Sequence, residues 1–201
     1  GTISTFSFYA NKHITTGEGG MLLTNDESIY QKLTKMRNLD FNNEKRFIHN
    51  NMYWNYRMSS MQASLGISQI RNLDKIIKLK IAQGNTYLDL LQDYQDYFQL
   101  PLSRVNQIQN HFWVFGIVLK KENARDNLIR SLSNEGIETR PFFWPLHLQP
   151  FLPVSKNTTN LRTSERIGKN GLYLPMGQHI NKKIQTDIVK TLLKESKTLR
   201  N

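Results

Sequence analysis

The sequence contains no cysteine among its 201 residues. A disulfide framework, a thiolate metal site and a cysteine nucleophile are therefore excluded, and a reducing cytoplasm is compatible with the composition. Long hydrophobic runs are also lacking, because the apolar stretch 112–119 is far shorter than the roughly 20 residues that span a bilayer. We therefore expect a cytoplasmic protein with no membrane partner and no bound metal.

Acidic residues are scarce, since 16 Asp and Glu stand against 27 Lys and Arg, and the formal net charge is +11. Residues 1–100 carry a net charge of +2 and residues 101–201 carry +9. The cations are scattered, without a run of five like charges or a recognisable nucleic-acid module. A nucleic-acid-binding domain rests on the charge alone, and a strong salt dependence of affinity would be its signature. A solvated basic face or a pocket for a phosphorylated small molecule explains the charge as well, so we expect no nucleic-acid partner.

The chain begins at Gly1 and residues 2–9 read directly as a strand, without the succession of a signal peptide. A methionine removed ahead of Gly1 and a piece of a longer protein both explain this start. The abrupt opening into a strand favours the second explanation.

The periodicity of the hydrophobic residues, together with the positions of glycine, proline and helix-capping residues, predicts an α/β chain. The expected strands cover residues 4–9, 20–24, 112–119, 137–139 and 172–174, and the strand 112–119 is expected to be buried on both faces. The expected helices cover residues 27–37, 60–72, 73–97, 123–134, 163–170 and 182–197, with Asp26 as the N-cap of the first and Gly136 at the C-cap of the fourth.

Three segments read as loops or connectors. Residues 38–55 are rich in Asn and aromatics and lack periodicity, which is typical of a functional loop. The stretch from Pro101 to Asn110 is the best candidate for a subdomain boundary. Four prolines argue against regular structure in the aromatic loop that follows residue 140, at positions 141, 145, 150 and 153.

The sharpest local feature is Lys12, which lies between two strands expected to be buried and is followed by the glycine-rich turn 17–20. Partial burial lowers the pKa of an amine, and only the neutral amine attacks an aldehyde to form a Schiff base. Taken alone the pattern is weak, because most lysines near glycines are surface residues. The turn resembles a phosphate loop only loosely, and a tight turn entering a strand explains it as well.

Four ordered segments carry a resemblance to a known family. They are Ser-Phe-Tyr-x-x-Lys with Thr-Thr-Gly-Glu-Gly-Gly-Met in residues 7–21, Asn-Tyr-Arg-Met with Gln-Ala and Gly in residues 55–66, the stretch 137–147, and Leu-Tyr-Leu-Pro in residues 172–175. The sequence resembles the sugar-nucleotide aminotransferases of the DegT/DnrJ/StrS type, which are fold-type I pyridoxal 5'-phosphate (PLP) enzymes. Within the family it is most similar to the GDP-perosamine synthase-like 4-aminotransferases.

The resemblance implies the C-terminal part of a fold-type I PLP-dependent aminotransferase. Residues 1–100 would form the end of the large PLP-binding domain with a long linking helix, and residues 101–201 the small C-terminal α/β domain. Family members are about twice as long. Their first half holds the glycine-containing phosphate loop, the aromatic residue that stacks on the pyridine ring and the acid that pairs with the ring nitrogen, so we expect the isolated chain to be inactive.

The resemblance also implies roles for individual residues. Lys12 would form the Schiff base with PLP and then move a proton, Ser7 would bond the cofactor phosphate, and Asn55 would reach that phosphate from the neighbouring subunit of a homodimer. A strand serine that satisfies a neighbour and a loop asparagine that makes a turn are the ordinary alternatives. Arg57 is either a carboxylate or phosphate anchor or a structural partner at the start of the helix at Ser60.

The aromatic loop is the expected substrate site. Arg140 and His147 bracket it, where a cation and an imidazole could hydrogen-bond a nucleotide diphosphate or sugar hydroxyls. The three consecutive aromatics 142–144, Phe143 among them, would wall the sugar or base. A satisfied structural histidine and ordinary aromatic packing stay open as alternatives.

The leading hypothesis is a PLP-dependent aminotransferase that converts a nucleotide-linked 4-keto-6-deoxy sugar to its amino sugar, with L-glutamate as donor. The resemblance implies a homodimer with shared active sites, and a role in making polysaccharides such as O-antigen. Neither the nucleotide nor the ring carbon, C3 or C4, follows from the sequence. The alternative is a non-catalytic module, a truncated product or pseudoenzyme that binds a partner chain.

Overall fold

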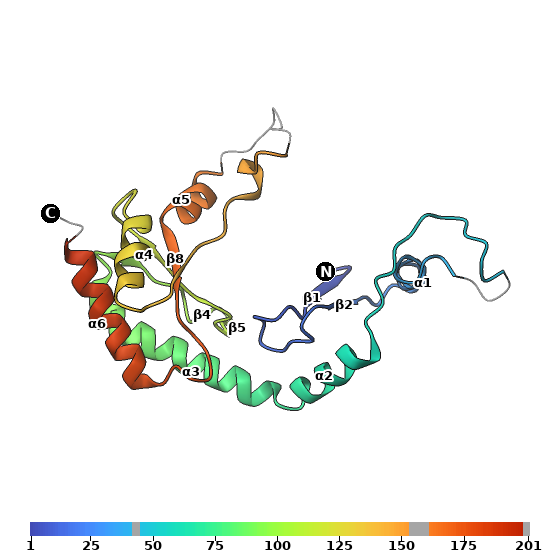
Figure 1. The fold of residues 1–201 in the computed structure, drawn as a ribbon, viewed down its shortest axis with the longest axis horizontal. Coiled ribbons are helices and arrows are strands. Elements are labelled where there is room, and N and C mark those ends of the chain that lie inside the picture. The colour runs from blue at the N-terminus through green and yellow to red at the C-terminus, as the bar shows by residue number, and fades with distance from the viewer. Residues whose placement is uncertain (42–44, 153–160, 199–201) are drawn as a thin grey trace. The chain divides into compact units, whose positions relative to one another are not determined.

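The computed structural model describes residues 1–41, 45–152 and 161–198, and it divides into two compact units, Gly1–Ile76 and Ile77–Asn201 (Figure 1). The division falls inside helix α3 (Leu73–Leu91) and not at the expected boundary between residues 100 and 101. The reason is packing, because the C-terminal part of α3 and strand β3 (Phe98–Gln99) belong to the core of the second unit. The assignment of the units to a large and a small enzyme domain stays a prediction.

The first unit opens with an antiparallel hairpin of β1 (Ser4–Ser7) and β2 (Gly20–Leu23), in which Ser7 pairs with Gly20. Helix α1 (Glu27–Arg37) begins as expected at Asp26, whose side chain accepts a hydrogen bond from the backbone N–H of Ile29. Helix α2 (Ser60–Ile70) begins with a complete capping box of Ser59 and Gln62.

The hairpin strands are exposed along their whole length, so the expectation that they are buried is wrong for this chain. Every buried apolar side chain among the described residues lies in the second unit, and nothing described in the first unit covers the hairpin. Leu22 and Leu23, for example, each keep 49% of their surface. An apolar strand pair of this kind needs further protein against it.

The second unit is built on a four-stranded antiparallel sheet with the order β3-β6-β8-β7. Besides β3, the sheet contains β6 (Phe115–Leu119), β8 (Gly171–Leu174) and β7 (Arg140–Pro141). In the register of β6 and β8, Phe115 pairs with Leu174. The short hairpin of β4 (Arg104–Val105) and β5 (Ile108–Gln109) is separate from this sheet.

Helices cover the sheet of the second unit. Helices α4 (Arg125–Asn134) and α6 (Lys182–Thr198) lie side by side (Figure 1), and α5 (Arg162–Asn170) packs against β6 and β8. Two short 3-10 helices, η1 (Gln92–Tyr94) and η2 (Leu146–Leu148), complete the unit.

The core of the second unit forms between α3, α4, α6 and one face of the sheet. Its fully buried members include Tyr87, Leu91, Phe115, Ile117, Leu128, Leu132, Leu172 and Leu192. Burial raises the pKa of Tyr87, whose hydroxyl donates to the carbonyl of Pro175 at 2.8 Å. On the other face, Gly116 lies against the ring of Phe142, so the strand is covered on both faces as expected.

Several expected boundaries shift. Helix α3, expected over residues 73–97, ends at Leu91, and β6 begins at Phe115 because Phe112 has a left-handed φ of 47°. The strand expected at 137–139 lies instead at Arg140–Pro141, where it pairs with β8. The prolines therefore do not exclude regular structure, since β7 and η2 both form within the loop, and Pro153 lies outside the described residues.

The ring of Phe112 lies directly against Gly84 of α3, and this contact gives a prediction about stability. A Cβ atom there would overlap the ring of buried Phe112. Gly84→Ala, which stabilises an ordinary helix, should here destabilise the chain by about 1–3 kcal/mol through overpacking. Thermal unfolding followed by circular dichroism tests this. Gly177→Ala is the matched control, since no atom lies within 4 Å of its added Cβ, and an equal effect of both variants would contradict the packing argument.

Candidate active site

The segment between β1 and β2 that carries Lys12 is held by a set of backbone hydrogen bonds. The backbone N–H of Phe8 donates to the carbonyl of Gly19 at 2.9 Å, and that of Thr16 donates to the carbonyl of Phe8 at 3.0 Å. The Thr15 hydroxyl donates to the same Phe8 carbonyl at 3.0 Å. The loop is thus closed at its base.

Contacts with α2 fix the glycine-rich part of this turn. The carbonyl of Glu18 accepts hydrogen bonds from the Thr16 hydroxyl at 2.6 Å and from Nε2 of Gln62 at 3.2 Å. A Cβ on Gly66 would come within 2.9 Å of the Thr16 methyl group, and one on Gly19, whose φ is 145°, within 2.6 Å of the Thr16 hydroxyl. Glycine at these two positions lets the turn sit directly on the helix.

Lys12 and Ser7 occupy this one structural element. The side chain of Lys12 is half-buried, and its backbone N–H donates to the carbonyl of Tyr9 at 3.0 Å. The backbone N–H of Tyr9 donates in turn to Oγ of Ser7 at 3.3 Å. The Ser7 hydroxyl accepts this bond and can still donate its own hydrogen to an incoming oxygen.

Asn55 lies in a second cluster of the first unit. Its backbone forms a bridge with Asn38, and its side-chain oxygen accepts hydrogen bonds from the backbone N and from Nε of Arg57, at 3.2 and 2.9 Å. Nη1 of Arg57 donates to the side-chain oxygen of Asn38 at 3.1 Å. Arg57 therefore pairs with two asparagines and not with the start of α2.

The loop that joins these two asparagines is organised by Asp40, and residues 42–44 of it lie outside the described residues. The Asp40 carboxylate is buried and accepts bonds from the backbone N of Asn50 and Asn51, at 2.9 and 2.7 Å, and from Nδ2 of Asn51. Burial alone raises the pKa of this carboxyl, but these hydrogen bonds outweigh it and the pKa is lowered. Asp40 thus ties the two described ends of the expected loop together.

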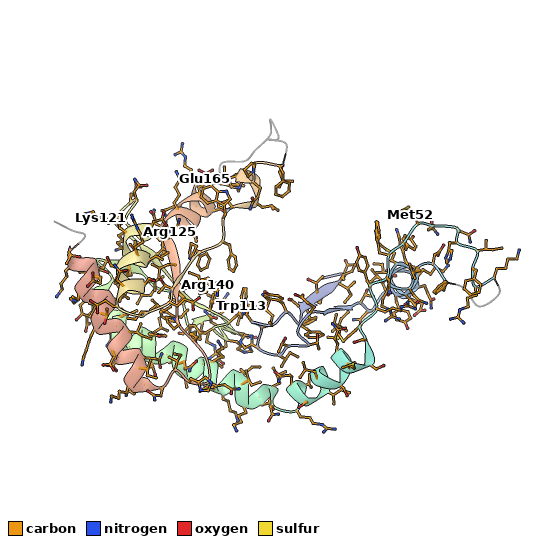
Figure 2. All side chains as sticks on the ribbon, in the orientation of Figure 1. Met52, Trp113, Lys121, Arg125, Arg140 and Glu165 are labelled. Carbon is orange, nitrogen blue, oxygen red and sulfur yellow. The ribbon has the colours of Figure 1, made fainter. Side chains whose placement is uncertain are left out.

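In the second unit, Arg140 (labelled in Figure 2) lies on β7. Its side chain is paired with that of Glu138. Nη2 and Nε of its guanidinium lie 3.0 and 3.2 Å from Oε1 of Glu138, and 64% of the Arg140 side chain is exposed. The hydrogen bond and the charge of Glu138 raise the pKa of Arg140. The guanidinium is therefore accessible, but an incoming anion competes with one carboxylate.

His147 lies on η2 and contacts α5. Its Nε2 lies 3.1 Å from Oε1 of Glu165, and only 18% of its side chain is exposed. This arrangement favours the structural alternative for His147, since the pair joins the 3-10 helix to α5.

Phe143 stacks with two other aromatic rings. Its ring centroid lies 5.7 Å from that of Trp113 and 6.4 Å from that of Tyr173, with interplanar angles of 15° and 28°. Yet 54% of Phe143 is exposed. The rings therefore form an open aromatic stack, marked in Figure 2 by Trp113.

The predicted residues belong to three structural groups, two in the first unit and one in the second. Ser7 and Lys12 share the hairpin turn, Asn55 lies in the Arg57 cluster, and the substrate-loop residues lie in the second unit. Asn38, which bridges to Asn55, and Trp113, which stacks on Phe143, had no sequence signal, because both come from distant segments. Among the residues described, no helix is long and apolar enough to cross a membrane, and no group of three or more His, Asp or Glu side chains could hold a metal.

Comparison with known proteins assigns the chain to a protein family. The model of the DegT/DnrJ/EryC1/StrS aminotransferase family matches residues 1–193. GDP-perosamine synthase of Vibrio cholerae is 35% identical over 180 residues, a match that covers 87% of this chain and 47% of that protein. The chain thus spans about half the length of this curated relative.

Solved structures show the same fold. Helicobacter pylori PseC, an aminotransferase involved in the biosynthesis of pseudoaminic acid, matches with a TM-score of 0.87 and 23% identity, over 98% of this chain and 54% of that one. The E. coli GDP-4-keto-6-deoxy-D-mannose-3-dehydratase with bound hydrated PLP matches with a TM-score of 0.76 and 24% identity, over 97% and 54%. The expected fold class, a partial α/β aminotransferase fold, is confirmed.

Proposed function

Because the chain belongs to the DegT/DnrJ/EryC1/StrS family of PLP-dependent aminotransferases, we propose that it is part of an enzyme that aminates a nucleotide-linked 4-keto-6-deoxy sugar at C4. L-glutamate is the proposed donor and becomes 2-oxoglutarate as its amino group replaces the keto oxygen. The similarity to a GDP-perosamine synthase favours a GDP-linked sugar, and with it a role in polysaccharide or O-antigen synthesis. We further propose a cytoplasmic homodimer with shared active sites.

The observation that carries this proposal is the position of Lys12, a half-buried residue on a turn fixed at its base and against α2. The donor set fits the aldehyde and phosphate ends of PLP, with the Lys12 amine for the aldehyde, and the Ser7 hydroxyl and the Asn55 amide for the phosphate. When bound, PLP supplies a conjugated ring that withdraws electrons from the carbon that loses a proton.

The chain's own residues then have defined tasks. The Lys12 amine would hold the cofactor at rest and, once displaced from it, would take and return protons at the α-carbon of the donor and at C4 of the sugar. The Ser7 hydroxyl and the Asn55 amide donate to the phosphate and set the position of the cofactor. Arg140 attracts the diphosphate of the substrate, and the Phe143 stack offers an apolar surface to its sugar or base.

A direct assay tests the proposed function. The full-length protein that contains this chain is incubated with PLP, glutamate and each of the GDP-, UDP- and dTDP-linked 4-keto-6-deoxy sugars, and 2-oxoglutarate and amino sugar are measured. We expect amination of one of them at C4. PLP binding without amination of any keto sugar would contradict the proposed substrate class, and no PLP binding at all would favour the non-catalytic module.

A substitution tests the role of Arg140. Arg140→Ala should raise the KM for the sugar nucleotide roughly tenfold, the lower end of the range for a charge-assisted contact because Glu138 already competes for the guanidinium. The KM for glutamate and the PLP spectrum should not change. Arg130→Ala, at an exposed arginine on α4, is the matched control. An equal loss for both substrates would make Arg140 structural and the surplus cations a solvated face.

A further inference from the structure

The side-chain amide of Asn55 is held in one orientation. Its oxygen accepts both hydrogen bonds from Arg57, one from the backbone N and one from Nε. An asparagine side chain has one carbonyl oxygen and one NH₂ group with two donors. With the oxygen turned toward Arg57, the NH₂ group is the end left to meet a ligand, and such a ligand must be a hydrogen-bond acceptor.

The backbone around this cluster does not depend on the guanidinium. The bridge between Asn38 and Asn55 sets the register of the two segments, and the backbone N of Tyr56 donates to the carbonyl of Arg37 at 3.0 Å. Main-chain bonds therefore hold the segments together by themselves. What the Arg57 side chain adds is the orientation of the Asn55 amide.

Asn38 fixes the guanidinium in turn. Its side-chain oxygen accepts from Nη1 of Arg57 at 3.1 Å, while Nε of the same guanidinium faces Asn55. The planar guanidinium is held by hydrogen bonds at two of its nitrogens, Nε and Nη1. It therefore cannot rotate away from Asn55 without losing both bonds. The positive charge beside the amide also polarises it, which strengthens the NH₂ group as a donor to an anion.

We propose that Arg57, braced by Asn38, is a positioning residue that presents the NH₂ group of Asn55 to the phosphate of PLP. The proposal rests on the proposed function and adds to it two residues that act through Asn55. Asn55 and Arg57 are both exposed, so a phosphate can approach the amide from solvent or from another protein surface. Lysine at position 57 keeps the charge but lacks the fork that holds the amide oxygen.

The test compares two aldehydes that differ only in the phosphate. Dissociation constants of PLP and of pyridoxal are measured by absorbance titration of the full-length protein and of Arg57→Lys, Asn55→Ala, the double variant and Asn38→Ala. Asn55→Ala and Arg57→Lys should each weaken PLP about tenfold and leave pyridoxal unchanged. The double variant should be no weaker than Asn55→Ala, because Arg57 acts through that amide. Asn38→Ala should give a smaller loss that is again specific for PLP.

Other outcomes overturn the proposal. Additive losses in the double variant would mean that Arg57 contacts the phosphate itself, and equal losses for PLP and pyridoxal would make the cluster merely structural. Unchanged PLP affinity with a raised KM for glutamate in Arg57→Lys would assign the guanidinium to the donor carboxylate. Arg71→Lys, at the exposed C-cap of α2, controls for the exchange of cations. A wild-type protein that binds no PLP would refute the proposed function itself.

Discussion

Lys12→Ala in the full-length protein is expected to abolish transamination while leaving the thermal unfolding temperature nearly unchanged. Proton transfer by a positioned amine contributes about a factor of 100 to 10,000, and loss of the covalent attachment adds to this. The fold should tolerate the change, because backbone hydrogen bonds of Phe8, Thr16 and Gly19 close the turn and the substitution leaves them intact. Product formation and circular dichroism measure the two effects.

Borohydride reduction followed by peptide mapping provides the control for this prediction. Lys80 is the lysine best suited to compete with Lys12 for the aldehyde of PLP, because burial lowers the pKa of Lys80 and a neutral amine reacts with aldehydes. Its Nζ donates to the carbonyl of Trp113 at 3.3 Å, which keeps it in a structural contact. We expect the reduced cofactor on Lys12 and full activity in Lys80→Ala. Label on Lys80, or activity that survives Lys12→Ala, would refute the assignment.

The isolated 201-residue chain is expected to show no measurable transamination and to self-associate. The resemblance places the ring-nitrogen acid, the stacking aromatic and part of the phosphate cradle outside this chain. The first unit, moreover, has no buried apolar side chain among its described residues. Its exposed hairpin side chains and open strand edges favour association. Light scattering after size-exclusion chromatography and an assay with PLP, glutamate and the keto sugar measure both properties.

A pair of leucine variants locates the associating surface. Leu22→Ser on β2 should reduce association, whereas Leu102→Ser should not, although Leu102 is more exposed at 68% against 49%. The difference arises because Leu22 lies between Met21 and Leu23 in an apolar strand, whereas Leu102 lies outside any strand, between Pro101 and Ser103. A monodisperse chain that aminates the keto sugar would contradict both parts of the prediction.

The sequence alone was sufficient for the family and for several helix ends. Helix ends follow from short-range chemistry, as at Asp26, which caps α1, and at Gly136, whose φ of 77° closes α4. The family follows from ordered motifs, among them the turn around Lys12, and the family match over residues 1–193 confirms it. These features depend on neighbours within a few residues, so the order of residues fixes them.

Only the tertiary structure decided which distant residues meet. The division of the chain inside α3 depends on the burial of Tyr87 and Leu91 in the second unit, which helical periodicity does not reveal. The pairing of His147 with Glu165 joins segments whose separation carries no sequence pattern. The Asn55 amide oxygen faces Arg57, whose guanidinium is held in turn by the side chain of Asn38, 19 residues away. Such contacts are chosen by the packing of the whole unit, because each local segment alone allows many partners.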